Sequence, residues 1–360
     1  AQSNNANYTI TANGKNMTSG NFGRTIGGTT DTYASIVGIT DEFTPTSSTL
    51  DIQLKFNRPD NPFNEGWLDY IELNLRRQLL MAGDQMHFRD IRTMGNAVSK
   101  FTLGNATPEL IVWDVTNPLQ PKRQEASLSG NELSFGAATD TLVEFIAFGN
   151  TGFLLAEAVG KIENQNYHSI DGVDMAIVYH KDFTAQAERL AEHRRQFNGL
   201  SVAMVDVEKL YNEFSSGRKD ATAIRDFARM LYDRNPERFK ALLLFGDASF
   251  DSRDIYNLGG DYVPTLETPL SVSPIFSYPT DDYFTLLSDG EGQNLSTGSL
   301  DIAVGRIPVK DEGEAKGVVD KIIQYDIEPQ NLRDWRNRIT FVGDDEDNNL
   351  HTGDADHIAV

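Results

Sequence analysis

Short segments in which hydrophobic and polar residues alternate dominate the first 165 residues. TLDIQLKF at 49–56 and WLDYIELNLRRQL at 67–79 are the plainest, and further strand-forming segments continue to residue 148 between Gly, Asn and Pro residues. Alternation places successive side chains on opposite faces of a β-strand. Many short strands without a helical period are typical of a sandwich or a jelly roll. We therefore expect residues 1–165 to form an all-β N-terminal domain.

The pattern changes after residue 165, where short hydrophobic segments alternate with amphipathic helical segments. The helical segments repeat their apolar residues every three or four positions, and the first of them ends at Gly199, a residue type that often terminates helices. Strands joined by helices typically form a parallel sheet with helices on its faces. We therefore expect an α/β domain over residues 166–360. Its predicted strands are 174–180, 200–207, 239–247, 300–309 and 338–345, and its predicted helices are 183–199, 222–234 and 314–327.

Acidic residues follow or border several of these predicted strands. Ligands of parallel sheets bind at the carboxyl ends of the strands, so acids placed there can converge on one site. Asp301 begins its strand, and it reaches the same edge only if that strand runs antiparallel. The acids that follow strands or lie in the loops between them are Asp247, Asp281, Asp282, Asp344, Asp345 and Glu346.

Two interpretations of these acids remain open. Converging carboxylates repel one another unless a cation neutralises them or some are protonated. Oxygen ligands from irregular loops favour calcium, which tolerates loose geometry. Alternatively, each carboxylate caps a local turn or a helix start. No EF-hand loop is present to decide between the two.

The composition excludes some classes of binding partner and some catalytic and metal-binding groups. The chain has 360 residues with 53 acids against 32 bases, a formal charge of −21. Such a field repels phosphate backbones and anionic lipids, so we expect no nucleic-acid partner. The chain contains no cysteine. A thiol nucleophile, a thiolate metal site and a disulfide are therefore excluded within this chain.

The chain carries no segment that resembles a membrane anchor or a signal peptide. No apolar run approaches the roughly 18 residues that a membrane-spanning helix requires. The first residues, AQSNNANYTI, have neither a basic region nor an apolar region. If the protein is exported, we expect its signal peptide to lie outside this sequence.

Several motifs of the second half resemble the catalytic domain of gingipain-type cysteine peptidases. They occur in the family's order, and the combination of GD, TDDYF, AVGRIP and KIIQYD is specific although no single element is. The matching segments are DMAIVYHKDF, LLLFGDASFDSRD, YPTDDYF, LDIAVGRIPV, EAKGVVDKIIQYD and DWRNRITFVGDDED. In the first half, GWLDYIELNLRRQL, QMHFRD, IVWDVTNP and NQNYHSI resemble the region before the peptidase domain in the family's sortase-like signal peptidases.

The resemblance implies a caspase-like α/β fold and a catalytic His–Cys pair. Sortase-like members belong to the bacterial type IX secretion system, where they remove C-terminal signal domains from secreted cargo and help attach the cargo to surface lipopolysaccharide. In family order, the His and the Cys follow later strands, whereas this sequence contains no Cys and no TGHG-like segment. We therefore expect a fragment with an incomplete peptidase domain that is inactive alone.

The implied partners and location follow from the same resemblance. The partners are the remaining C-terminal part of the peptidase domain, secreted cargo with C-terminal signal domains, and other type IX secretion components. The implied location is the outer membrane at the bacterial cell surface, reached through the periplasm.

The resemblance also assigns roles to individual residues. Asp247, Asp281 and Asp301 match positions that bind a structural calcium ion in gingipains, and Asp356 is a weaker fourth match. Backbone carbonyls near Tyr278 and Tyr283 are the further implied ligands.

Glu346 matches the acid that orients the catalytic His, and a shift of one residue gives this role to Asp345. Arg-specific gingipains carry an acidic specificity residue where this chain has Thr352 or His357, depending on the alignment; Asp354 lies nearby. Specificity for Arg is therefore not implied.

A second hypothesis belongs to a different class of protein. The chain would then be a non-catalytic, calcium-stabilised surface or scaffolding protein that reuses the peptidase fold. The gene downstream of Val360 discriminates between the two, because only the peptidase requires a continuing frame with a His and then a Cys.

Overall fold

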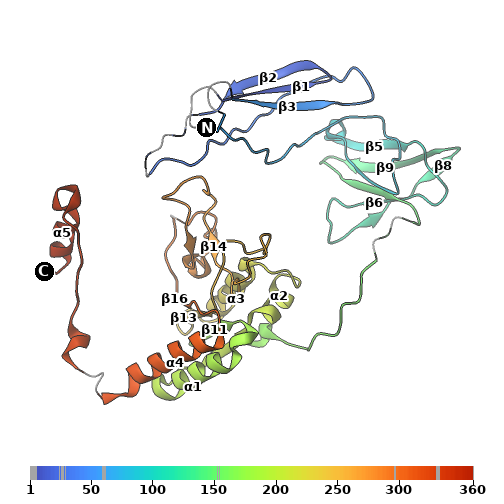
Figure 1. Cartoon of the computed structure of the whole chain (residues 1–360). Coiled ribbons are helices and arrows are strands. Elements are labelled where there is room, and N and C mark those ends of the chain that lie inside the picture. Colours follow the sequence, from blue (N-terminus) through green and yellow to red (C-terminus); the bar gives the residue numbers. More distant parts are fainter. Residues whose placement is uncertain are drawn as a thin grey trace. The chain divides into compact units, whose positions relative to one another are not determined.

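The computed structural model describes residues 6–359 except residues 24, 26, 27, 29, 59–61, 152, 154, 296 and 330–332. Contacts between Cα atoms divide the chain into two units, whose elements are labelled in Figure 1. Residues 67–162 form one unit, and residues 1–66 together with 163–360 form the other. The domain boundary that the sequence predicts at residue 165 is not tested by this division into units, and it stays a prediction.

The N-terminal residues form a three-stranded antiparallel sheet. Its strands are β1 (Asn7–Ala12), β2 (Lys15–Asn21) and β3 (Ile52–Asn57), in the order β2-β1-β3. Asn13 and Gly14 join β1 to β2 with φ angles of 49° and 74°. Positive φ at both positions is what a two-residue type I′ hairpin turn requires, and Asn-Gly supplies it at low cost. The strand predicted from TLDIQLKF is confirmed as β3.

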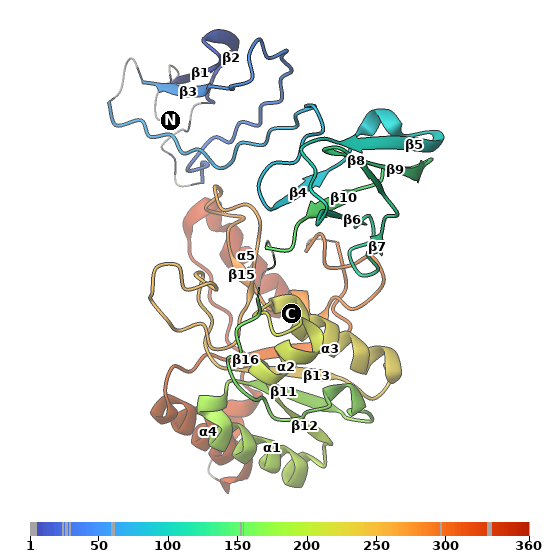
Figure 2. The same ribbon diagram turned by 90° about the vertical axis from the view of Figure 1, so that its right-hand side faces the viewer.

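Residues 67–162 contain two antiparallel sheets that share one hydrophobic core. The sheet orders are β4-β10-β6-β7 and β5-β9-β8. Phe101 of β5, Phe135 of β9 and Phe145 of β10 are almost fully buried, with ring centroids 4.9 to 5.3 Å apart. Figure 2 shows both sheets from the side. The strands are β4 (Gln85–Phe88), β5 (Asn96–Leu103), β6 (Ile111–Asp114), β7 (Lys122–Arg123), β8 (Ser127–Ser129), β9 (Glu132–Thr139) and β10 (Phe145–Phe148).

The strand predicted at residues 67–79 is absent. The segment lies outside every described strand, and Trp67 is 79% exposed. The first ladder contact after it is the isolated bridge between Leu80 and Gly104. Alternation alone does not make a strand, because the backbone groups also need a neighbouring strand to bond.

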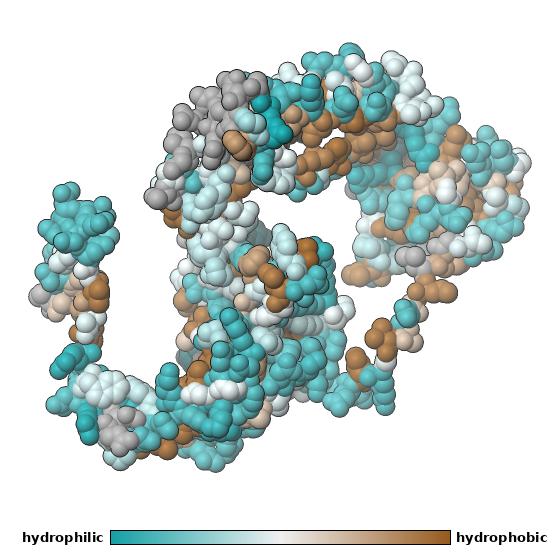
Figure 3. All heavy atoms as spheres, viewed as in Figure 1, coloured by the Kyte–Doolittle hydropathy of each residue, from teal (hydrophilic) through white to brown (hydrophobic). Residues whose placement is uncertain are grey.

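A second extended segment, which follows β10, also exposes apolar side chains. Phe153, Leu155, Val159 and Ile162 are all exposed in it. Figure 3 shows hydrophobic side chains along this connection.

Four parallel strands form the sheet of the α/β part, as predicted. They are β11 (Met175–Tyr179), β12 (Val202–Asp206), β13 (Ala241–Phe245) and β16 (Ala303–Ile307), in the order β12-β11-β13-β16. All three neighbouring pairs are parallel. A two-stranded antiparallel ribbon, β14 (Leu266–Glu267) with β15 (Pro279–Thr280), follows β13.

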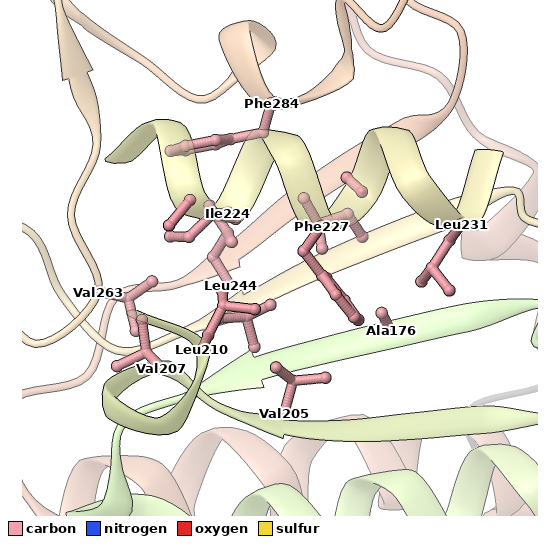
Figure 4. Close-up of a cluster of buried hydrophobic side chains, with 14 of the residues drawn as sticks. Ala176, Val205, Val207, Leu210, Ile224, Phe227, Leu231, Leu244, Val263 and Phe284 are labelled. Carbon is pink, nitrogen blue, oxygen red and sulfur yellow. The ribbon is translucent and has the colours of Figure 1, made fainter. Parts of the chain in front are cut away.

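Helices cover both faces of the parallel sheet, which Figure 2 shows edge-on. Ala176 and Val178 of β11 face the core beside α2 and α3, whereas Ile177 faces the core beside α1 and α4. Figure 4 shows Ile224, Phe227 and Leu231 of α3 pointing at the strands. The helices here are α1 (Thr184–Asn198), α2 (Val207–Phe214), α3 (Ala221–Arg234) and α4 (Glu312–Ile327).

Local sequence signals fix where these helices begin and end. The side chains of Asp206, Asp220 and Asp311 accept backbone N–H bonds at the starts of α2, α3 and α4, as N-caps do. Gly199 ends α1 in a left-handed conformation, which confirms the predicted C-cap. Helix α2 is not among the predicted helices, although Asp206 and the buried Leu210 signal it. None of the described helices is long and apolar enough to cross a membrane.

The strand predicted at residues 338–345 is wrong. These residues are not paired in any described strand, and Val342 is 91% exposed. A short 3-10 helix, Asp334–Asn337, precedes them, and α5 (Glu346–Ala359) follows, with φ near +52° to +60° at residues 347–349. An apolar sequence such as ITFV forms a strand only where a partner strand takes its backbone hydrogen bonds.

A cluster of charged groups joins the ends of α1 and α4. Asp326 Oδ2 lies 2.7 Å from His193 Nε2 and accepts a hydrogen bond from Arg194 Nη1 at 2.8 Å. The Asp326 side chain is 16% exposed. Burial opposes the charged form of Asp326, but the bonds and charges of His193 and Arg194 outweigh it and lower the pKa of this carboxyl.

We expect Asp326→Asn to lower the free energy of unfolding by about 1–2 kcal/mol at neutral pH, because two charge-assisted hydrogen bonds weaken. A carboxyl whose pKa is lowered by folding stabilises the fold above its unfolded pKa, about 4, and loses this effect as the pH falls through the folded value. The difference in free energy of unfolding between the wild type and Asp326→Asn should therefore vanish at acid pH. Urea titrations followed by helical circular dichroism test this. Asp320→Asn is the matched control, since Asp320 joins the same two helices through Arg189 but is more exposed. An equal loss in both variants would contradict the cluster's role.

Candidate functional site

The candidate site lies at the carboxyl edge of the parallel sheet, where β11, β13 and β16 end side by side. Beyond the strands, His180 N donates to Phe245 O, and Gly246 N donates to Ile307 O at 3.0 Å. Asp247 N donates to Val309 O at 3.0 Å. The buried β13 therefore holds Asp247 level with the end of β16.

Gly246 allows the loop after β13 to fold back on its own start. Its φ is 143°, and a Cβ there would lie 2.9 Å from Tyr262 Cβ and 3.1 Å from Val263 Cγ2. The amides of Tyr262 and Val263 both donate to Asp247 O. Any larger residue at 246 would therefore be strained and would separate these two backbone segments.

Two acids inside this loop, neither of them a predicted site residue, are bonded to other groups of the chain. Asp251 Oδ1 accepts from Ile255 N at 2.9 Å, and its Oδ2 accepts from Tyr256 N at 2.7 Å. The nearly buried Asp261 accepts from Ser249 N and pairs with Lys219 at 2.7 Å. Asp251 thus caps a local turn, whereas Asp261 bonds groups that are distant in the sequence.

Asp247 itself faces a lysine. Its Oδ2 lies 3.4 Å from Lys310 Nζ, in the segment that follows β16. Tyr262 donates its hydroxyl hydrogen to Lys310 O at 2.8 Å. The carboxylate is thus close to one cation of the chain.

Asp281 forms a bidentate ion pair with Arg306 of β16. Its Oδ2 accepts from Arg306 Nε and its Oδ1 from Arg306 Nη2, each at 2.8 Å. Thr265 Oγ1 also donates to Asp281 Oδ1 at 3.0 Å. Both carboxylate oxygens therefore have strong donors from the chain.

Asp301 lies at the opposite edge of the sheet. Because β16 runs parallel to β13, Asp301 precedes the amino end of β16, so the antiparallel alternative is wrong. Asp247 is level with Val309, eight residues further along the chain, which places the two acids up to about 26 Å apart. Asp301 accepts from Leu287 N at 2.8 Å and from the Tyr232 hydroxyl at 3.2 Å.

The remaining predicted ligands are Asp356 and the backbone carbonyls near Tyr278 and Tyr283. Asp356 is an exposed residue of α5. The carbonyl oxygen of Tyr278 accepts from Thr268 N. Tyr283 is buried beneath the guanidinium of Arg225, which lies 5.5 Å from its ring centroid. Burial raises the pKa of Tyr283 and the charge of Arg225 partly offsets this, so the phenol stays protonated at neutral pH.

The residues predicted to orient a catalytic His lie on the last described segment. Glu346 begins α5 and Asp345 precedes it, and both are exposed. The neighbouring Asp344 contacts His351, with 2.7 Å between Oδ1 and Nδ1. The assignment of Glu346 or Asp345 stays a prediction.

As placed, the predicted calcium ligands do not fit one ion. No three His, Cys, Asp or Glu side chains come close enough to share a metal in the part of the chain that the structure describes. Asp247, Asp281, Asp301 and Asp356 are divided between both edges of the sheet and α5. The calcium site stays a prediction that this arrangement does not support.

The sequence analysis missed the basic residues that accompany these acids. Lys219, Lys310 and above all Arg306 contact the carboxylates, yet only the acids were singled out. Arg306 gave a usable signal, because a charged residue inside a hydrophobic parallel strand requires a buried partner.

Comparisons with known proteins agree with this architecture. The family model described as Peptidase family C25 matches residues 168–359. The crystal structure of dimeric latent PorU from Porphyromonas gingivalis is similar over 95% of this chain and 34% of that chain, with 26% identity and a TM-score of 0.71. The predicted resemblance to PorU and to the gingipains is thus confirmed.

Two further comparisons do not extend the family assignment. The crystal structure of the Arg-specific cysteine proteinase gingipain R is 18% identical over 43% of this chain and 28% of that chain, and its TM-score of 0.31 is too low to carry an argument. No curated protein matches the chain.

The chain therefore spans about a third of the PorU chain that it matches. Since the family model covers more than half of the 360 residues, the chain belongs to peptidase family C25.

Proposed function

We propose that this chain is an N-terminal or internal fragment of a sortase-like cysteine endopeptidase of a type IX secretion system. The complete enzyme would remove C-terminal signal domains from secreted cargo and help attach that cargo to the cell surface. It would act at the outer membrane after export through the periplasm.

The similarity to PorU carries this proposal. It extends over 95% of the chain, and so includes the β-strands before the peptidase segment as well as the parallel sheet. A gingipain-like protease with an unrelated N-terminal region would not explain a match of this extent.

The chemistry requires residues that this sequence lacks. A cysteine peptidase attacks with a thiolate and activates it with an imidazole, and the chain contains no cysteine. In this proposal the Cys and the catalytic His come from the C-terminal part of the peptidase domain. That part of the domain is the first binding partner that we propose for this chain. The present residues would supply the framework, and Glu346 would orient the catalytic His.

We expect the isolated chain to hydrolyse no peptide bond, because it has no thiolate nucleophile. Mass spectrometry of a cargo protein with its C-terminal signal domain, incubated with the purified chain, tests this. The control is the longer product of the same gene, if its frame continues to a His and a Cys. Peptidase activity that co-purifies with the isolated chain through successive purification steps would contradict the proposal. A stop codon after Val360 would favour the non-catalytic scaffold instead.

In the longer enzyme, Glu346→Gln should lower kcat by about 10²–10⁴-fold, because the catalytic His loses the acid that orients it and stabilises its cation. Steady-state kinetics should show KM nearly unchanged. Asp345→Asn is the matched control and should leave kcat within about tenfold of wild type. If Asp345→Asn gives the large loss, the alignment shifts by one residue. If neither variant does, the orienting role is wrong.

A further inference from the structure

Residues 163–170 form a strap that lies against α2 and leads into β11. The strap contains one short 3-10 helix, Tyr167–Ser169, and none of its residues belongs to a described strand or is fully buried. Tyr167 and Ile170 pack on the edge of the core beside α2 and α3, and the Tyr167 hydroxyl accepts from Asp206 N at 3.0 Å. The strap is therefore held mainly by side-chain contacts and not by a β-ladder.

Glu213 of α2 fastens the middle of the strap with both carboxylate oxygens. Oε1 accepts from Tyr167 N at 2.7 Å, and Oε2 accepts from His168 N at 3.1 Å. The same Oε2 lies 2.7 Å from His168 Nδ1, and the imidazole stacks on Phe214 with ring centroids 4.4 Å apart. Three polar contacts of the strap thus converge on one carboxylate.

The charge of Glu213 strengthens these contacts. The Glu213 side chain is only 13% exposed. Burial opposes its charged form, but the bonds from Tyr167 N and from His168 outweigh burial and lower the pKa of this carboxyl. Hydrogen bonds to an ionised acceptor are stronger than those between neutral groups. The ionised carboxylate of Glu213 therefore stabilises the strap against α2.

Single contacts hold the two ends of the strap. Near its start, Gln165 Nε2 donates to Lys209 O at 2.8 Å, and the exposed Glu163 pairs with the Lys209 ammonium at 3.0 Å. Near its end, Arg234 Nη1 donates to Ile170 O at 2.6 Å. Exposed ion pairs contribute little to stability. Glu213, with three contacts, is therefore the main polar tie of the strap.

The elements beside the strap are held much more firmly. Strand β11 is bonded to a parallel strand on each side, and Phe227 of α3 is fully buried. Segments with few buried apolar contacts open locally at a lower free energy than the core of the same domain. The strap has the properties of such a segment, whereas β11 and α3 do not.

We propose that the strap is a conformational device that Glu213 keeps closed and that opens while the parallel sheet stays folded. Opening frees up to about 26–29 Å of chain, because each extended residue spans about 3.3–3.6 Å. The connection that enters β11 from residues 67–162 then has a short state and a long state. The inference does not depend on the proposed peptidase role.

Limited digestion of the whole chain with chymotrypsin reports this opening, because the protease cleaves after aromatic residues in accessible, extended backbone. Cleavage after Tyr167 requires an open strap. Cleavage after the buried Phe227 requires unfolding of the α/β part. Phe153 is exposed in the extended segment before the strap and serves as the internal reference. Mass spectrometry of the first products gives the initial rate at each position.

Glu213→Gln should raise the initial rate of cleavage after Tyr167 about tenfold or more, because the variant loses the charge and replaces one acceptor oxygen by a donor. Cleavage after Phe227 should stay as slow as in the wild type, and cleavage after Phe153 should not change. His168→Ala should give a smaller rise after Tyr167, since two backbone bonds to Glu213 remain.

Glu208→Gln is the matched control. Glu208 belongs to the same helix, and its half-exposed side chain pairs with Lys181, which lies outside the strap. The variant removes the same charge from α2, so it should be cleaved after Tyr167 at the wild-type rate.

Four outcomes would overturn the proposal. If Glu213→Gln is cleaved after Tyr167 no faster than Glu208→Gln, Glu213 does not close the strap. If cleavage after Tyr167 and after Phe227 rises together, the strap opens only when the whole α/β part unfolds. A Glu213→Gln chain that does not fold contradicts the proposal for the same reason. A larger effect of His168→Ala than of Glu213→Gln would mean that the imidazole, and not the carboxylate, closes the strap.

Discussion

Burial of the parallel strands on both faces is the constraint on which the α/β part depends. Side chains of β11 and β13 alternate between two helical layers, so neither strand has a solvent-facing side. A strand of this kind cannot carry polar chemistry along its length, and polar groups are therefore displaced to its ends. The run ALLLF and the sharp turn at Gly246 place Asp247 at the carboxyl edge for this reason.

The elements that the sequence revealed are those whose signals are local. Helices α1, α3 and α4 combine an apolar stripe with a cap or a terminating glycine, and β11 to β13 are compact apolar segments between them. Such information is carried within about fifteen residues. The two mistaken strands, at 67–79 and 338–345, have suitable residues but lack a described partner, and pairing is a property of distant segments that no local pattern encodes.

The site was harder to predict because spacing along the chain reveals the acids but not their neighbours. Asp301 and Asp247 are both near strand ends, yet the parallel direction of β16 puts them at opposite edges. Asp281, predicted as a metal ligand, forms a bidentate ion pair with Arg306. The sequence does not distinguish a loop carboxylate that binds a metal ion from one that binds a backbone amide or a guanidinium. Only the fold decides among these three partners.

The extended segment 67–79 has a further consequence for the behaviour of the protein in solution. It exposes a series of large apolar residues with the alternation of a strand, which is the sequence type that associates edge to edge. Its interspersed charges, including Asp69, Glu72 and Arg77, act as gatekeepers that discourage stacking between molecules. These charges therefore lower the tendency of the exposed apolar side chains of 67–79 to pair between molecules.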